Sequence, residues 1–360
     1  MKVLQIIDSL GTGGAEKLIL DSVPLYIEQG ITTDVLVLRD ENYPFMQQLE
    51  ELNICKVYKL GRGSVYHPIH ILKIAEILPK YDIAHVHLFP AQYWAVLAKK
   101  LSKAKTKLIF TEHNTSNKRI NNKFLAVIDR YFYSKYDKIV SISKEIDEII
   151  KRHTKLKMSQ VVFKVIENGV DLNNIYEAEE LQELKQVNQN IILQVSAFRP
   201  QKDQKTLINS FTYLPENTIL LLAGDGPLKS GLEIFTKELG LSERILFLGN
   251  RSDIPQLLKT ADVIVLSSHY EGMSLSSIEG MASGRPFIAS DVPGLSEIVS
   301  DAGLLFPQGN AKLLAEHIQK LLGNKVLYDE VVEKCQERAE EYDISIMVKK
   351  YIQLYEEVLA

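Results

Sequence analysis

The stretch "KVLQIIDSLGTGGAEKLIL", residues 2–20, is the one from which the fold is predicted. A short apolar run leads into a turn that contains Gly11, Gly13 and Gly14, and a longer amphipathic segment follows. This order predicts a buried β-strand that turns tightly into a helix. The same alternation recurs along the chain, and it is typical of parallel sheets covered by helices.

The predicted strands form two series, separated by a polar stretch at residues 168–190. The first series is residues 2–7, 32–38, 55–60, 82–88, 107–113, 137–143 and 161–168; the second is residues 190–198, 218–224, 244–249, 263–268, 286–291 and the shorter 303–306. We therefore expect an α/β chain with two doubly wound domains, residues 1–170 and 190–342. Residues 343–360 have helical periodicity and are expected to cross back over the first domain.

The bulk properties of the chain exclude several classes of protein. Its 360 residues, 46% of them apolar, can bury two substantial cores. A net charge of −4 gives no overall basic field, so nucleic acid is not an expected partner. Cys55 and Cys335 lie far apart, which indicates neither a disulfide framework nor a cysteine metal site and favours the cytoplasm. No apolar run reaches the roughly 18 residues of a membrane span, so we expect a soluble protein.

The glycine turn after the first strand is a first candidate for ligand binding. Gly13 and Gly14 let a ligand approach the backbone, and the helix N-terminus behind them favours an anion. The dinucleotide fingerprint is not met, because its third glycine would fall on Glu16. A tight turn from strand to helix explains the same glycines without any ligand.

A second candidate is the stretch "HYEGMSLSSIEGMASGRPFIASDVPG", residues 269–294. If a helix begins near Ser274, the backbone N–H groups of Met273, Ser274 and Leu275 are available to a diphosphate. Gly272 allows the ligand to come close to the backbone.

Two glutamates in this stretch could reach opposite ends of one long ligand. Glu271 precedes the predicted helix, and Glu279 lies more than a turn inside it. A carboxylate accepts hydrogen bonds from adjacent hydroxyls, which suits a ribose at one end and a hexose at the other. The alternative is that Glu271 caps the helix and Glu279 is solvated.

Several motifs together give the chain its resemblance to a known family. They are "GGAEK" (13–17), "ENGVD" (167–171), "FRPQKDQKTLI" (198–208), "LLAGDGP" (221–227), "LFLGNRSDIPQLLKTADVIVLSS" (246–268), "EGMSLSSIEGMASGRPFIASDVPG" (271–294) and "SEIV" (296–299). The chain resembles the retaining glycosyltransferases of family 4 over nearly its whole length. The resemblance implies the GT-B fold, two Rossmann-like domains that face each other across the active-site cleft.

The resemblance also implies an activity. Such an enzyme moves a hexose from a nucleoside diphosphate sugar, a UDP- or GDP-sugar, to a carbohydrate or lipid-linked carbohydrate acceptor with retention. A role in bacterial surface polysaccharide such as capsule would fit. A sugar-nucleotide epimerase or a sugar phosphorylase on the same fold stays open, as does a non-catalytic sugar-nucleotide-binding subunit. The phosphorylase would need a pyridoxal lysine, which no motif indicates.

Roles for the candidate donor residues follow from the family's pattern. Glu271 is assigned to the donor sugar and Glu279 to the ribose, and Gly13, Gly14 and Gly226 to donor binding. Lys202 matches the family's lysine for the diphosphate. The family's arginine would fall on Ala197, so Arg199 is expected to replace it, with Lys205 nearby. A solvated basic turn is the alternative. Because side chains can neutralise the leaving group and no Asp-x-Asp element is present, we expect neither a metal nor a cofactor.

Histidines in the first domain complete the predicted site. His113 follows a predicted strand, and the resemblance assigns it to the reacting sugar as a catalytic residue. His87 and Asn114 are predicted to bind the acceptor. His85 is expected to face the opposite side of its strand from His87 and is left out of the site.

Two further features complete the predictions from the sequence. The lysine-rich segment "AKKLSKAKTK", residues 98–107, is either a solvated helix end or a contact with anionic lipids on the inner face of the membrane. Arg251 in "LGNRSDIP" is expected near the nucleotide base.

Overall fold

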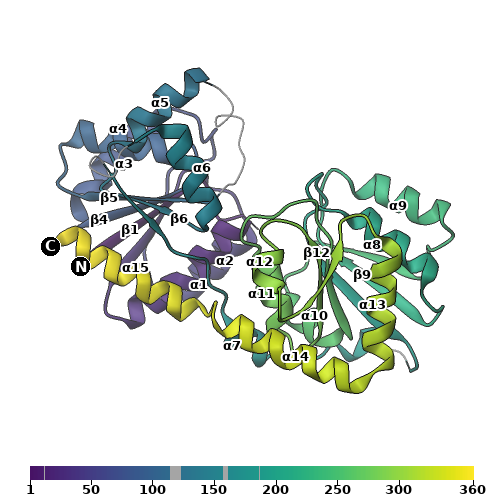
Figure 1. Ribbon diagram of the computed structural model, residues 1–360. Helices are drawn as coiled ribbons and strands as arrows, with labels where there is room; N and C mark the ends of the chain where they lie inside the picture. Colours follow the sequence, from purple (N-terminus) through teal and green to yellow (C-terminus); the bar gives the residue numbers. More distant parts are fainter. Residues whose placement is uncertain (12, 114–122, 157–160, 186) are drawn as a thin grey trace. The chain divides into compact units, whose positions relative to one another are not determined.

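A computed structural model describes residues 1–360 apart from 12, 114–122, 157–160 and 186 (Figure 1). The chain folds into two compact units. The N-terminal unit comprises Met1–Gly169 and Ile344–Ala360, and the C-terminal unit comprises Val170–Asp343. Each unit is built on a sheet of parallel strands, as the alternation of apolar and amphipathic segments predicts.

The N-terminal unit has a 7-stranded sheet in the order β3-β2-β1-β4-β5-β6-β7. Its strands are β1 (Lys2–Ile7), β2 (Thr32–Val37), β3 (Val57–Lys59), β4 (Ile83–His87), β5 (Lys107–Glu112), β6 (Lys138–Ser141) and β7 (Val162–Val165). The strand order reverses where β1 pairs with β4, and ligands of open α/β sheets bind beyond the strand ends at such a point.

Helices cover both faces of this sheet (Figure 1). One face carries α1 (Gly14–Glu28), α2 (Pro44–Leu52) and α15 (Ile344–Leu359); the other carries α3 (Ile69–Ile77), α4 (Ala91–Ser102), α5 (Lys123–Tyr133) and α6 (Lys144–Thr154). The strands are apolar along most of their length because both of their faces are buried. The C-terminal helix α15 packs on α1, and its residues Tyr351, Leu354 and Tyr355 are buried.

The C-terminal unit has a 6-stranded sheet in the order β10-β9-β8-β11-β12-β13. Its strands are β8 (Asn190–Val195), β9 (Thr218–Ala223), β10 (Ile245–Gly249), β11 (Val263–Leu266), β12 (Phe287–Asp291) and β13 (Leu304–Pro307). Its helices are α7 (Leu172–Tyr176), α8 (Gln204–Ser210), α9 (Lys229–Glu238), α10 (Ile254–Thr260), α11 (Leu275–Ala282), α12 (Ser296–Val299), α13 (Ala311–Gly323) and α14 (Lys325–Glu340). Here the strand order reverses where β8 pairs with β11.

Every predicted strand is present, and two series of parallel strands confirm the predicted fold class. The polar stretch at 168–190 contains a short helix, α7, which packs on α10 and α11 because Leu172 and Ile175 are buried. In the described part of the chain, no helix is both long and apolar enough to cross a bilayer.

Candidate active site

A buried ion pair lies at the point where the strand order of the C-terminal sheet reverses. Lys202, in the loop after β8, donates from Nζ to Oε1 of Glu271, in the loop after β11. Ser268 donates from Oγ to the same carboxylate oxygen at 2.5 Å. The Lys202 and Glu271 side chains are 9% and 7% exposed. The structure thus brings together two residues that were predicted from separate motifs.

Hydrogen bonds between polar side chains join the loop after β8 to the loop after β11. Gln194, in β8, accepts at Oε1 from Ser267 N at 3.2 Å and from Ser267 Oγ at 2.8 Å. Ser196 accepts from Nε2 of both Gln194 and Gln204, at 2.8 and 3.0 Å. These residues were missed in the sequence. Their signal is a glutamine inside an otherwise apolar strand, which is buried and needs partners.

The helix beside the pair begins where the sequence predicts. Helix α11 starts at Leu275 with Ser274 as its N-cap, and the Ser274 side chain makes no capping hydrogen bond to the helix. Met273 and Ser274 are buried and Gly272 is half-buried. Glu279 is half-buried on the second turn of α11, whereas Glu271 lies in the loop before this helix.

The loop after β12 closes on the loop that carries Glu271. Glu271 N donates to Pro293 O at 3.3 Å. At Gly294, where φ is +82°, a Cβ atom would lie 2.2 Å from Glu271 O and 2.4 Å from Gly272 O. Only glycine allows this approach, so Gly294 helps to fix the position of the Glu271 loop.

Three further cations predicted for the donor site are exposed, unlike the buried pair. Arg199 and Lys205 are exposed, and Lys205 Nζ lies 5.6 Å from the centre of the Phe235 ring. Arg251 is exposed and donates from Nε to Asp253 Oδ1 at 2.7 Å, a contact that raises the pKa of its guanidinium. Lys202 N donates to Arg199 O at 2.9 Å, but in the described part of the chain no side-chain hydrogen bond or ion pair joins the three cations to Lys202 or Glu271.

Gly226 lies in the loop after β9, close to the loop after β8. A Cβ atom at Gly226 would lie 2.4 Å from Phe198 O. Phe198 N donates to Asp225 O at 2.9 Å, and Leu228 N donates to Phe198 O at 3.1 Å. The glycine therefore permits two loops at the same edge of the sheet to run side by side.

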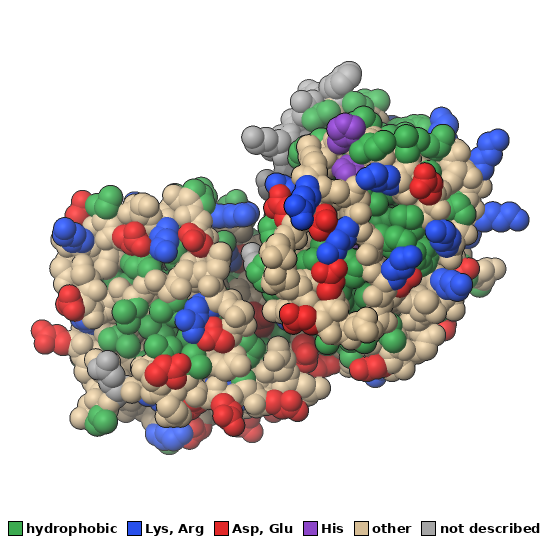
Figure 2. Space-filling model, turned by 180° about the vertical axis from the view of Figure 1, so that it is seen from behind, with side chains coloured by type: hydrophobic (Ala, Val, Ile, Leu, Met, Phe, Trp, Pro, Cys, Tyr) green, Lys and Arg blue, Asp and Glu red, His purple; other side chains and the backbone are tan. Residues whose placement is uncertain are grey.

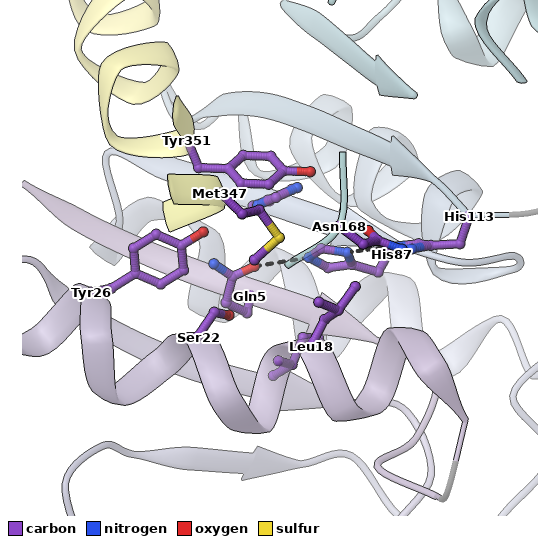
Figure 3. A pocket seen from close by; sticks show the side chains of 11 residues that line it. Gln5, Leu18, Ser22, Tyr26, His87, His113, Asn168, Met347 and Tyr351 are labelled. Atoms are coloured by element: carbon purple, nitrogen blue, oxygen red, sulfur yellow. Dashed lines mark hydrogen bonds between the residues drawn. The ribbon is translucent and has the colours of Figure 1, made fainter. Parts of the chain in front are cut away.

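Three histidines of the N-terminal unit lie together: His85 and His87 on β4, and His113 directly after β5. Figure 3 shows His87 and His113 beside each other. The rings of His85 and His87 are 4.2 Å apart, so both face the same side of β4. The prediction that His85 faces away from His87 is wrong, because residues two apart on a strand share a face. His87 Nδ1 and His113 Nε2 are 3.0 Å apart, which places all three rings in one cluster.

The histidine cluster lines a cavity that the sequence did not indicate (Figure 3). Its walls are Gln5, Leu18, Ile19, Ser22, Tyr26, His85, His87, His113, Asn168, Met347 and Tyr351. Burial lowers the pKa of His85 to about 3 and that of His113 to about 4, and it also lowers the pKa of His87. At neutral pH these imidazoles are uncharged, so they offer hydrogen bonds to a ligand and not positive charge.

The glycine turn after β1 has a carboxylate beside it. Gly13 is the N-cap of α1 and Gly14 is its first residue. A Cβ atom at Gly13 would lie 2.4 Å from Glu16 Oε2. A carboxylate at this helix end interacts favourably with the helix dipole and would repel an anionic ligand. Asn114 lies outside the described residues.

Comparisons with known proteins agree with this architecture. The family model described as "Glycosyltransferase Family 4" matches residues 12–174, and the model described as "Glycosyl transferases group 1" matches residues 176–342. An N-acetyl-alpha-D-glucosaminyl L-malate synthase of Bacillus anthracis is 27% identical over 306 residues, 80% of this chain and 78% of its own. The Campylobacter jejuni N,N'-diacetylbacillosaminyl-diphospho-undecaprenol alpha-1,3-N-acetylgalactosaminyltransferase is 27% identical over 354 residues, 90% of this chain and 91% of its own.

A solved structure shows the same fold. Anabaena HepE in complex with UDP and glucose superposes with a TM-score of 0.85 at 22% identity, over 99% of this chain and all of the other.

Proposed function

From the membership of this chain in the glycosyltransferases of family 4, with the GT-B fold, we infer that it transfers a hexose from a nucleoside diphosphate sugar with retention at the anomeric carbon. That the chain is a glycosyltransferase follows from the two family matches and from its relatives. The donor type, the acceptor and the retention are the proposal. The observation that carries it is the buried pair of Lys202 and Glu271 at the reversal of the C-terminal sheet.

Lys202 is proposed to neutralise the diphosphate as it leaves. A lysine that is 9% exposed is largely shielded from water, and its charge acts more strongly there than at the surface. The N–H groups at the start of α11 would add the partial positive charge of a helix N-terminus. Together they give a reason for transfer without a metal ion.

Glu271 is proposed to hold hydroxyls of the donor sugar, and Glu279 those of the ribose. In the structure Glu271 accepts from Lys202 and Ser268 at one oxygen, Oε1, and a carboxylate has further acceptor sites. Arg199 keeps its proposed catalytic place at the diphosphate, where it would replace the family's arginine. Lys205 and Gly226 are proposed to bind the donor, and Arg251 to lie near the nucleotide base. Gly13 and Gly14 are still proposed to lie near the donor. The Glu16 carboxylate beside Gly13 argues against a phosphate at that helix end, because it would repel an anion.

His113 is proposed to line the reacting end of the site in the N-terminal unit, with His87 and Asn114 toward the acceptor. Because burial keeps the pKa of His113 at about 4, we assign it a hydrogen bond to a sugar hydroxyl and not the role of a general base. The departing diphosphate would then accept the proton of the acceptor, as a front-face mechanism requires.

The acceptor is proposed to be a lipid-linked carbohydrate in bacterial surface polysaccharide synthesis. The names of two relatives, from Campylobacter jejuni and Escherichia coli, specify diphospho-undecaprenol acceptors. At the end of α4, the exposed Leu101 is flanked by the exposed Lys100, Lys103 and Lys105, a composition that suits anionic lipid. In the view of Figure 2, lysine and arginine side chains are more numerous over the N-terminal unit than over the other.

A panel of nucleoside diphosphate sugars tests the proposal. A donor at 100 times its dissociation constant should stabilise the protein by about 2.7 kcal/mol, which a thermal unfolding scan detects. We expect one donor to stabilise the wild type and to release its nucleoside diphosphate on incubation. Binding without release would favour the non-catalytic subunit, and the absence of both for every UDP- and GDP-sugar would contradict the proposal.

A further inference from the structure

Two tyrosines of the C-terminal helix reach the histidine cluster of the N-terminal unit. Tyr351 and Tyr355 of α15 are 4% and 0% exposed. The hydroxyl of Tyr355 lies 2.7 Å from His85 Nδ1, and that of Tyr351 lies 3.0 Å from Thr111 Oγ1. A continuous chain of hydrogen bonds therefore runs from α15 into the strands that carry the histidines.

Gln5 joins the two halves of this hydrogen-bond chain. Its Oε1 lies 2.9 Å from His87 Nε2, and its Nε2 donates to the Tyr355 hydroxyl at 3.3 Å. An amide oxygen only accepts and an amide NH₂ group only donates. The orientation of the Gln5 amide therefore sets the direction of every hydrogen bond on either side of it.

On one side of Gln5, this direction reaches His113. The amide oxygen requires a proton on His87 Nε2, so His87 Nδ1 is unprotonated in the neutral ring. His87 Nδ1 must then accept from His113 Nε2, which lies 3.0 Å away. Since His113 is also neutral, its Nδ1 is left as a hydrogen-bond acceptor.

On the other side of Gln5, the hydrogen bonds run from Tyr355 through His85 to Thr111 without conflict. The Tyr355 oxygen accepts from Gln5 Nε2, so its own proton is available to His85 Nδ1. His85 Nε2 then carries a proton and donates to Thr111 Oγ1 at 2.7 Å. Each buried polar group in this chain of hydrogen bonds has a partner, which a low-dielectric interior requires.

We propose that Gln5 and Tyr355 are positioning residues that fix the tautomer of His113, so that its Nδ1 accepts a hydrogen bond from a sugar hydroxyl. This inference rests on the proposed role of His113 in the site. The reversed amide would reverse every bond and turn His113 Nδ1 into a donor. Tyr355 takes part because its hydroxyl accepts from Gln5 Nε2 at 3.3 Å and lies 2.7 Å from His85 Nδ1.

Nitrogen-15 NMR of the protein labelled at histidine tests the inference directly, since the chemical shifts of the two ring nitrogens identify the tautomer. Signals are assigned with single His→Gln variants at neutral pH. We expect His85, His87 and His113 all to carry the proton on Nε2 in the wild type. A proton on Nδ1 of His113 in the wild type would overturn the proposal, and this measurement needs no variant at Tyr355 or Gln5.

Tyr355→Phe tests the positioning role. We expect His113 to show a mixture of tautomers and kcat to fall by at least about tenfold with KM for the donor little changed, because a wrong tautomer removes a hydrogen bond at the reacting end. Tyr136→Phe is the matched control, since Tyr136 is buried in the same unit and donates to Gln92 O at 2.6 Å. That variant should keep the wild-type tautomers and activity.

The outcomes separate this inference from the proposed function. An unchanged His113 tautomer in a folded Tyr355→Phe protein would overturn the positioning role, whatever the activity. If the tautomer changes as expected but His113→Ala retains wild-type turnover, the hydrogen-bond chain stands and the proposed role of His113 is wrong.

Discussion

At the scale of single residues, the contact between Lys202 and Glu271 decides how the donor site is understood. Each residue could be predicted from its own motif, but their sequence separation of 69 hides the ion pair. Removing one partner of a buried pair leaves the other charge without compensation, so these two side chains depend on each other. Their variants must therefore be judged on stability as well as on activity.

Lys202→Ala should lower kcat/KM by roughly 100-fold or more, because Lys202 is the proposed counter-charge of the leaving diphosphate; that factor equals about 2.7 kcal/mol of transition-state stabilisation. Steady-state kinetics on the donor found in the panel gives the value, and circular dichroism checks that the protein is folded. Lys237→Ala, on the exposed side of α9, is the control for loss of one positive charge in the same unit. Turnover within a factor of about three of wild type would rule out the role.

The two glutamates should affect different ligands. Glu279→Ala is expected to weaken binding of the nucleoside diphosphate itself, because its proposed partner is the ribose. Glu271→Ala should leave the free nucleoside diphosphate bound and lose the contribution of the sugar. Calorimetric titration of both variants with both ligands measures this. Equal losses for both ligands in both variants would contradict the division of roles.

At the scale of strands, helices and loops, the periodicity of the sequence predicts nearly all of the regular structure. Each apolar run became a strand, because parallel strands buried on both faces are apolar throughout. The prediction that His85 faces away from His87 was wrong, because residues two apart on a strand lie on the same face. Gln5 and Tyr355 were missed because their contact spans 350 residues and leaves no local signal.

The loop after β12 offers a test of how the Glu271 loop is held. Gly294→Ala should weaken donor binding, because the new Cβ atom would lie 2.2 Å from Glu271 O and displace that loop. Gly309→Ala is the matched control: its φ is +78°, and nothing lies within 4 Å of the added Cβ. Both variants should lose about 1–2 kcal/mol of stability from backbone strain alone, measured by urea unfolding. Equal donor affinity of the two variants in calorimetry would show that the loop contact is not needed.

The burial of His85 on β4 predicts that the stability of the protein depends on pH. In the unfolded chain a histidine takes up a proton near pH 6.5, whereas burial in the folded protein holds the pKa of His85 at about 3. Between these two values the unfolded state binds more protons, so the unfolding free energy falls as the pH is lowered from 6.5. One such histidine contributes a slope of up to about 1.4 kcal/mol per pH unit.

Urea unfolding between pH 7 and pH 4.5 measures this slope. His85→Gln should reduce the slope by up to about 1.4 kcal/mol per pH unit, the contribution of one proton. Tyr136→Phe, which removes a buried hydrogen bond of the same unit, should leave the slope unchanged. An equal slope in wild type and His85→Gln would mean that His85 is not buried in its neutral form.

At the scale of the whole molecule, the sequence predicts two doubly wound domains and a glycosyltransferase, and both are confirmed. It does not predict how side chains from distant segments meet, since those contacts exist only once the sheets have formed. The ion pair at Glu271 and the tyrosines beside the histidines are of this kind. The sequence also does not predict the chemical identity of the acceptor, because it contains no residue pattern typical of one compound.

The central claim is that protein groups, and not a divalent cation, balance the charge of the departing diphosphate. The direct measurement is the rate of nucleoside diphosphate release from the selected donor, in excess EDTA and in added magnesium or manganese. Because Lys202 and the start of α11 carry the proposed positive charge, we expect nearly equal rates in both conditions. A loss of more than about tenfold on chelation, equal to about 1.4 kcal/mol and restored by one added metal, would contradict the account.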